Sequence, residues 1–350
     1  MTRVVYKEEN RYYKSLQNEA VSEKELTMNN KDYDVVALGE LLIDFTPYGK
    51  SEQGHDNLEA NPGGAPCNVL SMVSKLGGKT AFLGKVGDDH YGHYLEEVAR
   101  ECRIDTQGVL FDPNYFTTLA FVHLDDTGDR SFSFARKPGA DMMYLKEEVR
   151  TDIIDKALIF HYSTVPMSRE PERSTVHFAV EHAKQSGCIL SFDPNIRTFL
   201  WDDMNEAIAE MKYGLSMCDI LKISEEELVL AAGVEDIEKG VEILHQQYPN
   251  IRLFLATLGK KGCYYKLGDI KGMQGTFTTV KTIDTTGAGD TFIGCCLYRI
   301  AAQGGLDFTE TSLAAMIRHA NAAASLITTR RGAMRVVPGS KEIEDLLRQN

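Results

Sequence analysis

From Asp34 onward the sequence alternates between short apolar runs of strand length and longer segments of helical period. The predicted strands cover residues 35–38, 80–83, 157–160, 189–192, 220–223 and 253–256. The predicted helices between them cover residues 68–76, 91–103, 171–186, 204–216, 225–232 and 237–248. Strands that alternate with helices usually form a parallel sheet covered on both faces. We therefore predict an α/β fold, with a mostly parallel sheet flanked by helices.

Two segments interrupt this alternation. Residues 42–45 run into a polar, glycine-containing stretch, and residues 116–136 resemble two strands around an Asp-Asp-Thr-Gly-Asp turn. We predict that these segments, about 45–62 and 114–136, form a small β-sheet lid beside the main domain. The acidic turn lacks the glutamate that closes a calcium loop, because Arg136 occupies that position. We interpret the turn as a solvated hairpin tip.

Composition narrows the functional classes. A formal net charge of −13 over 350 residues argues against a nucleic-acid partner, which requires many cations to neutralise phosphates. Seven cysteines without a CxxC pair indicate a reducing compartment. No apolar stretch approaches the roughly 20 residues of a membrane span, and no signal core is present. We expect a cytoplasmic protein without a membrane partner, in which a polar extension (1–33) precedes one domain (34–345) and Met28 is a possible start.

A glycine-rich turn stands directly before an apolar helix, in the sequence TIDTTGAGDTFIGCCLYRI (282–300). Gly287, Ala288 and Gly289 allow close backbone approach, and the first N–H groups of the helix then point at an anion. The turn is neither a Walker A loop nor a dinucleotide fingerprint. Asp290 could accept a hydroxyl proton beside a transferring phosphoryl group, or it could simply cap the helix.

The motif DTTGAGD resembles the C-terminal signature of the ribokinase-like (PfkB) carbohydrate kinases, and the segment PGGAPCNVLSMVSKLGGKTAFLGKVGDD resembles their N-terminal signature. The resemblance covers about 34–345, and GELLIDF, FARKPGAD and DPNIR are typical of the fructokinase-like branch. The chain departs from the family pattern at Leu70, Cys295 and Cys296, where helix packing is decided. The resemblance implies a ribokinase-like fold.

The resemblance also implies the roles of the substrate side. It makes Asp290 the catalytic base and the backbone of residues 287–289 the anion hole. Asp44, at the end of the first strand, would bind sugar hydroxyls, for which a carboxylate is suited. Gly64 and Asn68 would line the same site, although Asn68 could instead cap a helix. Two arginines remain open: Arg136 could cover the sugar or form a surface salt bridge, and Arg197 could face substrate beside Asp193.

For the nucleotide side, the resemblance implies ATP and Mg²⁺, and a monovalent cation, K⁺, beside the anion hole. Glu227 would act on Mg²⁺ through water, and Asp284 and Thr286 would hold K⁺. The residues expected to contact the nucleotide are Asn195, Lys222, Ser224, Thr257, Gly259, Gly262 and Asn321. His161 has no second ligand at metal spacing, so we interpret it as a structural or substrate-edge residue.

These expectations describe an ATP-dependent sugar kinase that converts fructose to fructose 6-phosphate. The alternatives within the same chemistry are a 2-keto-3-deoxygluconate kinase and a ribokinase-type kinase. An alternative of another class is a sugar or nucleotide sensor without turnover, which the presence of base, anion hole and Glu227 argues against. The partners expected are a small sugar and ATP, and the family suggests a homodimer through the lid, which would cover its sheet edges.

Overall fold

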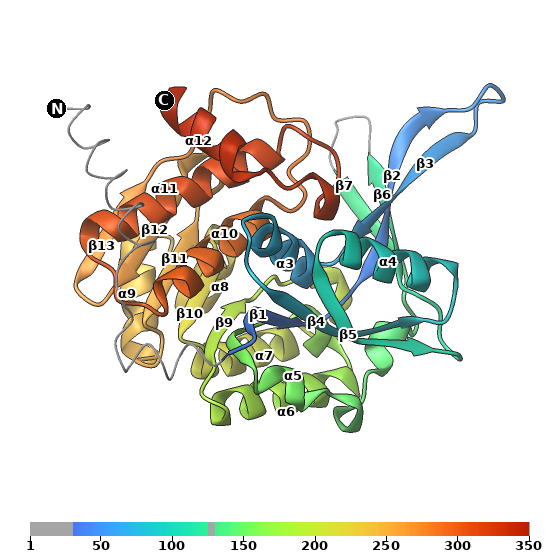
Figure 1. Cartoon of the computed structure of the whole chain (residues 1–350), viewed down its shortest axis with the longest axis horizontal. Helices are drawn as coiled ribbons and strands as arrows, with labels where there is room; N and C mark the ends of the chain where they lie inside the picture. The colour runs from blue at the N-terminus through green and yellow to red at the C-terminus, as the bar shows by residue number, and fades with distance from the viewer. Residues whose placement is uncertain (1–30, 125–129, 350) are drawn as a thin grey trace.

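The computed structural model describes residues 31–124 and 130–349 (Figure 1). Within these ranges it describes every side chain except those of residues 124 and 130–132. Its centre is a nine-stranded sheet. In spatial order the strands are β13 (Ile270–Gln274), β12 (Cys263–Leu267), β11 (Leu253–Thr257), β10 (Ile220–Ser224), β9 (Ile189–Asp193), β8 (Ala157–Ser163), β1 (Tyr33–Leu38), β4 (Thr80–Gly87) and β5 (Ile104–Asp112). The strands from β11 to β5 are parallel, and β12 and β13 continue the sheet in antiparallel pairs.

Helices cover both faces of this sheet, because successive side chains of each buried strand point to opposite sides. Val35 and Ala37 of β1 belong to one core, and Val36 and Leu38 to the other. The first core is covered by α3 (Ala65–Lys75), α4 (His90–Glu101), α10 (Ala288–Gln303), α11 (Glu310–Ile327) and α12 (Ser340–Gln349). The second is covered by α5 (Thr151–Ile154), α6 (Glu172–Gln185), α7 (Met204–Met217), α8 (Glu225–Ala232) and α9 (Ile237–Gln247).

A separate four-stranded sheet forms the predicted lid. Its strands, in spatial order, are β3 (Asp56–Gly63), β2 (Leu42–Lys50), β6 (Leu119–Leu124) and β7 (Arg130–Ala135). In Figure 1 the β2–β3 hairpin projects from the helical body. Phe45 anchors the lid to the body, because its ring stacks on Phe121 at 5.1 Å and meets the edge of Tyr91 of α4 at 5.7 Å.

The structure confirms the predicted α/β fold, its six buried strands and its six helices, which begin and end within a few residues of the predicted bounds. Sequence patterns missed β5, β12 and β13. The expectations for the N-terminal extension up to residue 30, for Met28 and for the tip of the acidic turn (125–129) lie outside the described residues. Among the residues that are described, we find no helix with the length and apolarity of a membrane span.

The sheet order locates a site. The strand order reverses at β1, because β4 and β5 add to one side of it and the later strands from β8 onward add to the other. Open α/β sheets bind ligands at the carboxyl ends of strands near such a reversal. Asp193, Ser224 and Thr257 end three neighbouring strands, β9, β10 and β11, at this edge.

Candidate active site

The turn before α10 leaves several backbone donors unused. Gly287 is the helix N-cap, with φ of 73° in the left-handed region that favours glycine. The Ala288 N–H donates to the carbonyl of Thr285 at 3.2 Å. Within the described chain, the N–H groups of Gly287, Gly289 and Asp290 find no protein acceptor. Ala288 therefore differs from the sequence expectation for the anion hole, and the Asp290 N–H is available in its place.

Asp290 stands in the first turn of α10 and is tied to α3. Its Oδ2 accepts a hydrogen bond of 2.8 Å from Nδ2 of Asn68. Burial raises the pKa of Asp290, while Asn68, Lys222 and Arg197 oppose that rise. Asn68 lies inside α3, whose N-cap is Gly64, so the helix-cap alternative for Asn68 is wrong. The Oδ1 atom of Asn68 is buried and has no partner among the described residues, so it can still accept a hydrogen bond.

Asp44 reaches the same place from the lid. From the sequence we expected Asp44 at the end of the first strand. In the structure β1 ends at Leu38, and Asp44 is the third residue of β2. Burial raises the pKa of Asp44 to about 7, with Arg197 opposing and Asp290 adding to the shift. The lid thus brings a second carboxyl group close to the one on α10.

Lys222 supplies a cation behind the glycine-rich turn. Its Nζ contacts both carboxylate oxygens of Asp193, at 3.1 and 2.9 Å. Burial alone would lower the pKa of Lys222, but Asp193 and Glu227 raise it, so the ammonium stays charged. A Cβ atom placed on Gly289 would lie 3.2 Å from this Nζ, which puts the ammonium directly beside the turn. An anion held by the turn would meet this positive charge.

Glu227 joins two segments of the site. Its two carboxylate oxygens accept hydrogen bonds from the N–H groups of Ile196, at 2.8 Å, and Ser224, at 2.9 Å. Ser224 in turn caps α8 by accepting from the Glu227 N–H at 3.2 Å. The carboxylate is therefore fixed in position and retains further lone pairs for a water molecule.

The donors at this site limit which metal ions it could hold. The described residues contain no group of three His, Cys, Asp or Glu side chains placed to hold a metal ion. Mg²⁺ fits such a place when water and nucleotide phosphates supply most of its ligands and one carboxylate assists. At the turn, Asp284 Oδ1 accepts from the N–H and the hydroxyl of Thr286, at 2.9 and 2.7 Å. This oxygen-rich turn has the donor type that hard monovalent cations take.

The residues expected on the nucleotide side are close together, but some are already engaged. The Thr257 hydroxyl donates to the carbonyl of Ile223 at 3.3 Å. Gly259 and Gly262 adopt positive φ values of 53° and 105° on either side of a tight turn after β11. Asn321 is buried, and its Nδ2 donates to the carbonyls of residues 274 and 275, at 2.9 and 3.1 Å. Its donors thus hold the loop after β13, which leaves its oxygen for a ligand.

Arg136 lies in the interior rather than on the surface, so the surface salt-bridge alternative is wrong. Its Nε contacts Asp141 at 2.7 Å, and its Nη2 contacts Glu172 at 3.3 Å. A third buried carboxyl, Glu40, accepts from the Ala65 N–H at the start of α3, and burial raises its pKa to about 7. Sequence patterns do not single out these three carboxyl groups, although GELLIDF contains Glu40 and FARKPGAD contains Asp141.

Three remaining residues border the site. Arg197 is exposed, its side chain has no hydrogen-bond or ion-pair partner in the described chain, and its charge opposes the raised pKa values of Asp44 and Asp290. Asn195 is buried with φ of 45°, an uncommon left-handed conformation that asparagine tolerates. Burial lowers the pKa of His161 to about 3, and its Nδ1 lies 3.0 Å from the Ser191 hydroxyl. These contacts favour the structural interpretation of His161.

The sequence of this chain is similar to those of known carbohydrate kinases. The family described as pfkB family carbohydrate kinase matches residues 32–339. Among curated proteins, "Probable fructokinase-7" of Arabidopsis thaliana is 40% identical, covering 93% of this chain and 96% of that protein. "Fructokinase-1" of Zea mays is also 40% identical, covering 89% of this chain and 97% of that protein.

Solved structures agree with these sequence relatives. A fructokinase with bound ATP from Xylella fastidiosa matches with a TM-score of 0.82 and 31% identity, covering 91% of this chain and 99% of that one. A fructokinase from Vibrio cholerae O395, solved with fructose, ADP and a calcium ion, matches with a TM-score of 0.79 and 32% identity, covering 89% and 98% of the two chains. A double mutant from the same organism, with fructose, ADP and potassium, gives 0.81 and 32%, covering 91% and 99%.

Proposed function

The chain belongs to the pfkB family of carbohydrate kinases, and on that premise we propose that it transfers the γ-phosphoryl group of ATP to fructose, giving fructose 6-phosphate and ADP. One observation carries the proposal. Asp290 stands in the first turn of α10, beside unpaired N–H groups and the Lys222 ammonium, with its carboxylate oriented by Asn68.

Each residue then has a chemical task. Asp290 accepts the proton of the sugar hydroxyl as that oxygen bonds to the γ-phosphorus and the bond to the bridging oxygen of ADP breaks. The free N–H groups of Gly287, Gly289 and Asp290 receive the negative charge of the transferring group, and Lys222 stabilises it from behind. Because these donors are already fixed by the helix and by Asp193, they need little rearrangement during the reaction.

Metal ions complete the nucleotide site in this proposal. A bound Mg²⁺ would supply positive charge that offsets the charge of the nucleotide phosphates. Glu227 would hold one of its water ligands, and Asp284 with Thr286 would hold K⁺ behind the anion hole. The loops after β11 and β13, with Thr257, Gly259 and Asn321, would shape the nucleotide side.

The charges around the sugar favour fructose over 2-keto-3-deoxygluconate. The keto-acid brings a carboxylate to a place that already holds Asp44 and Asp290. Arg136 is committed to two protein carboxylates, so Arg197 is the candidate cation that remains for such a group. Asp44 and Asn68 suit a neutral polyol instead, because both accept hydrogen bonds from hydroxyl groups. We propose that Arg136 acts on the sugar only through the lid that it anchors.

We also propose that the protein is cytoplasmic and forms a homodimer, and the lid supports the dimer. Its sheet has free edges at β3 and β7, and the large side chains of Tyr48 and Leu58 on the projecting hairpin are 62% and 44% exposed. A second copy would cover these edges and apolar groups.

The test is a coupled ADP-release assay over fructose, 2-keto-3-deoxygluconate, ribose and glucose, with Asp290→Asn alongside. We expect fructose to give the highest kcat/KM. The variant should lose at least about 100-fold in kcat, a typical general-base contribution, and still bind ATP by calorimetry. Asp269→Asn, on an exposed turn, is the matched control and should behave as wild type.

Each other outcome has a definite meaning. Near-normal turnover by Asp290→Asn would remove the general-base assignment. A higher kcat/KM for the keto-acid would overturn the choice of sugar and leave the kinase chemistry in place. ATP binding without turnover on any sugar would favour a sensor.

A further inference from the structure

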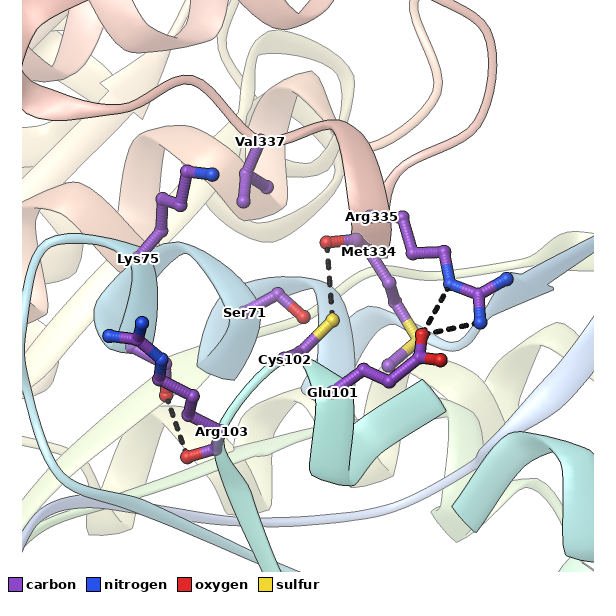
Figure 2. A pocket seen from close by; sticks show the side chains of 9 residues that line it. Ser71, Lys75, Glu101, Cys102, Arg103, Met334, Arg335 and Val337 are labelled. Atoms are coloured by element: carbon purple, nitrogen blue, oxygen red, sulfur yellow. Dashed lines mark hydrogen bonds and ion pairs between the residues drawn. The ribbon is translucent and has the colours of Figure 1, made fainter. Parts of the chain in front are cut away.

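A cavity of about 540 Å³ opens at the opposite end of α3 from Asn68 (Figure 2). The last turn of α3, the end of α4 and the 3₁₀ turn η6 (Met334–Val336) form its walls. Cavities of this size hold small organic molecules rather than single ions. None of the residues assigned to the proposed reaction lines it.

The charged side chains at this cavity are mainly cationic. Arg335 contacts Glu101, with Nε to Oε2 at 2.9 Å, and the Tyr94 hydroxyl at 2.9 Å. Lys75 and Arg103 also line the cavity, and in the described chain neither side chain has a hydrogen-bond or ion-pair partner. Figure 2 shows these two on one side of the cavity and Arg335 on the other. Three cations face one carboxylate, in a protein whose formal net charge is −13. Such a local excess of positive charge attracts anions.

A buried polar group adds an independent sign of a ligand. Ser71 lines the cavity and is only 2% exposed, and the one acceptor that its hydroxyl meets among the described residues is the Cys102 sulfur, a weak one. A buried hydroxyl with only a weak sulfur acceptor is poorly satisfied, so a water or ligand oxygen in this cavity would be a better partner for it. Beside it, Met334 and Val337 offer apolar surface to the same space. The cavity thus combines cations, one poorly satisfied hydroxyl and an apolar wall.

We propose that this cavity binds a small phosphate monoester. Its phosphate would lie between Lys75 and Arg103 and accept a hydrogen bond from Ser71, and its carbon chain would lie against Met334 and Val337. Arg103 has φ of 62°, where glycine would be less strained, and the arginine keeps a guanidinium at this wall.

The occupant would touch two elements, α3 and η6, that in turn contact the reacting groups on α10. Ser71 follows Asn68 by nearly one turn of α3, and Asn68 orients Asp290. On the other wall, Ala333 precedes η6, and its Cβ lies 2.8 Å from where a side chain on Gly287 would begin. A ligand that fixes α3 against η6 therefore acts on the base and on the anion hole together.

Cys102 gives a local readout. It lines the cavity and is partly exposed, whereas the other six cysteines, all of them in the described chain, are buried. Modification of Cys102 by a maleimide, located by mass spectrometry, therefore reports occupancy of this cavity. Glycerol 3-phosphate is the probe. At tenfold excess over its dissociation constant it should slow the modification by roughly tenfold, in proportion to the unoccupied fraction. Glycerol should not protect, and inorganic phosphate should protect more weakly.

The variant Lys75→Gln with Arg103→Asn removes both unpaired cations, and asparagine tolerates the left-handed backbone at 103. It should raise the dissociation constant of the probe at least about tenfold, as loss of charge-assisted hydrogen bonds predicts. Lys212→Gln with Lys239→Gln, on exposed helix surfaces elsewhere, removes the same charge and should leave protection intact.

Three results would overturn the proposal: no protection of Cys102 in the wild type, equal protection in the two double variants, or protection by phosphate without protection by glycerol 3-phosphate. The measurement needs no turnover, so its failure would leave the proposed kinase activity untouched.

Discussion

The ionised Asp44 carboxylate destabilises the folded protein when no ligand is bound. Its carboxyl is largely removed from water and lies near other acidic groups, so its charged form is poorly stabilised until a ligand donates hydrogen bonds. Arg197 is the cation that opposes this cost, and its exposure weakens the effect. Groups that are poorly stabilised in the free protein and well stabilised by substrate are typical of binding sites.

We therefore expect Asp44→Asn to stabilise the protein while weakening activity. The folded-state pKa of about 7 exceeds the value of 3.8 for a free aspartate, so the folded state holds the proton more tightly. The free energy of unfolding must then fall as pH rises from about 4 to about 7, and the loss is complete above that range. At pH 8 the variant should be more stable than wild type by at least about 1 kcal/mol after allowance for solvent screening.

Urea denaturation at pH 8 and near pH 4 measures this difference, which should shrink at the lower pH. The same variant should lose at least about 2 kcal/mol of transition-state binding with fructose, because hydroxyl groups are left unpaired. Asp269→Asn is again the control. A variant that is less stable than wild type at pH 8 would show that ionised Asp44 is well paired in the free protein.

Two glycines of α10 allow close contacts at two different places along the helix. Gly289, in the first turn, lies against the Lys222 ammonium. Gly294, one and a half turns later, lies against α3, where an added Cβ would come within 2.7 Å of the Val69 carbonyl and 2.9 Å of the Met72 side chain. The first glycine faces the proposed phosphoryl group and the second allows α3 and α10 to pack closely.

Alanine at each position should separate these tasks. Gly289→Ala gains up to about 1 kcal/mol of helix propensity, which offsets the cost of shifting Lys222, so its unfolding free energy should change little. Its methyl group would displace Lys222, and kcat should drop at least about tenfold, or about 1.4 kcal/mol. Gly294→Ala should instead cost about 1–3 kcal/mol of stability through overpacking. Denaturation and steady-state kinetics on both variants measure this, and full turnover by Gly289→Ala would contradict the proposed position of the phosphoryl group.

The predictable part of the site was local in sequence. Gly287, Gly289 and Asp290 lie in one turn, so the sequence alone indicated an anion site with a carboxylate. The hydrogen bond between Asn68 and Asp290 joins residues 222 positions apart, and only tertiary packing brings them together. The sequence predicts the Ala288 N–H as part of the anion hole, whereas in the structure it donates to the carbonyl of Thr285. That hydrogen bond depends on the exact turn geometry, which residue types alone do not reveal.

The missed elements have similar causes. β13 alternates between exposed and half-buried residues at the sheet edge, and β5 carries polar residues among its apolar ones, so neither shows a buried-strand pattern. Arg136 follows a lid strand in a polar context, where an arginine is usually exposed. Its burial follows from Glu172, which lies 36 residues away on α6.

Arg136 connects the lid to the body of the molecule. It follows β7 of the lid and contacts Asp141 and Glu172, which belong to the body. Arg136→Ala should lower the free energy of unfolding by about 3–5 kcal/mol, because it leaves buried carboxylates without their cation. Lys137→Ala, at the exposed neighbouring position, should change stability little. Urea denaturation and the KM for fructose separate the alternatives: unchanged stability with a raised KM would return Arg136 to direct contact with the sugar.

The junction between the lid and α3 has a dynamic consequence. β3 ends at Gly63 and α3 begins at Ala65, so a single residue, Gly64, separates the hairpin from the helix that carries Asn68. With no linker to absorb rotation, the hairpin acts as a lever on α3. Opening of the hairpin and reorientation of the Asn68 amide should then share one exchange rate in relaxation-dispersion measurements, so the enzyme would admit its sugar and align its base in a single kinetic event.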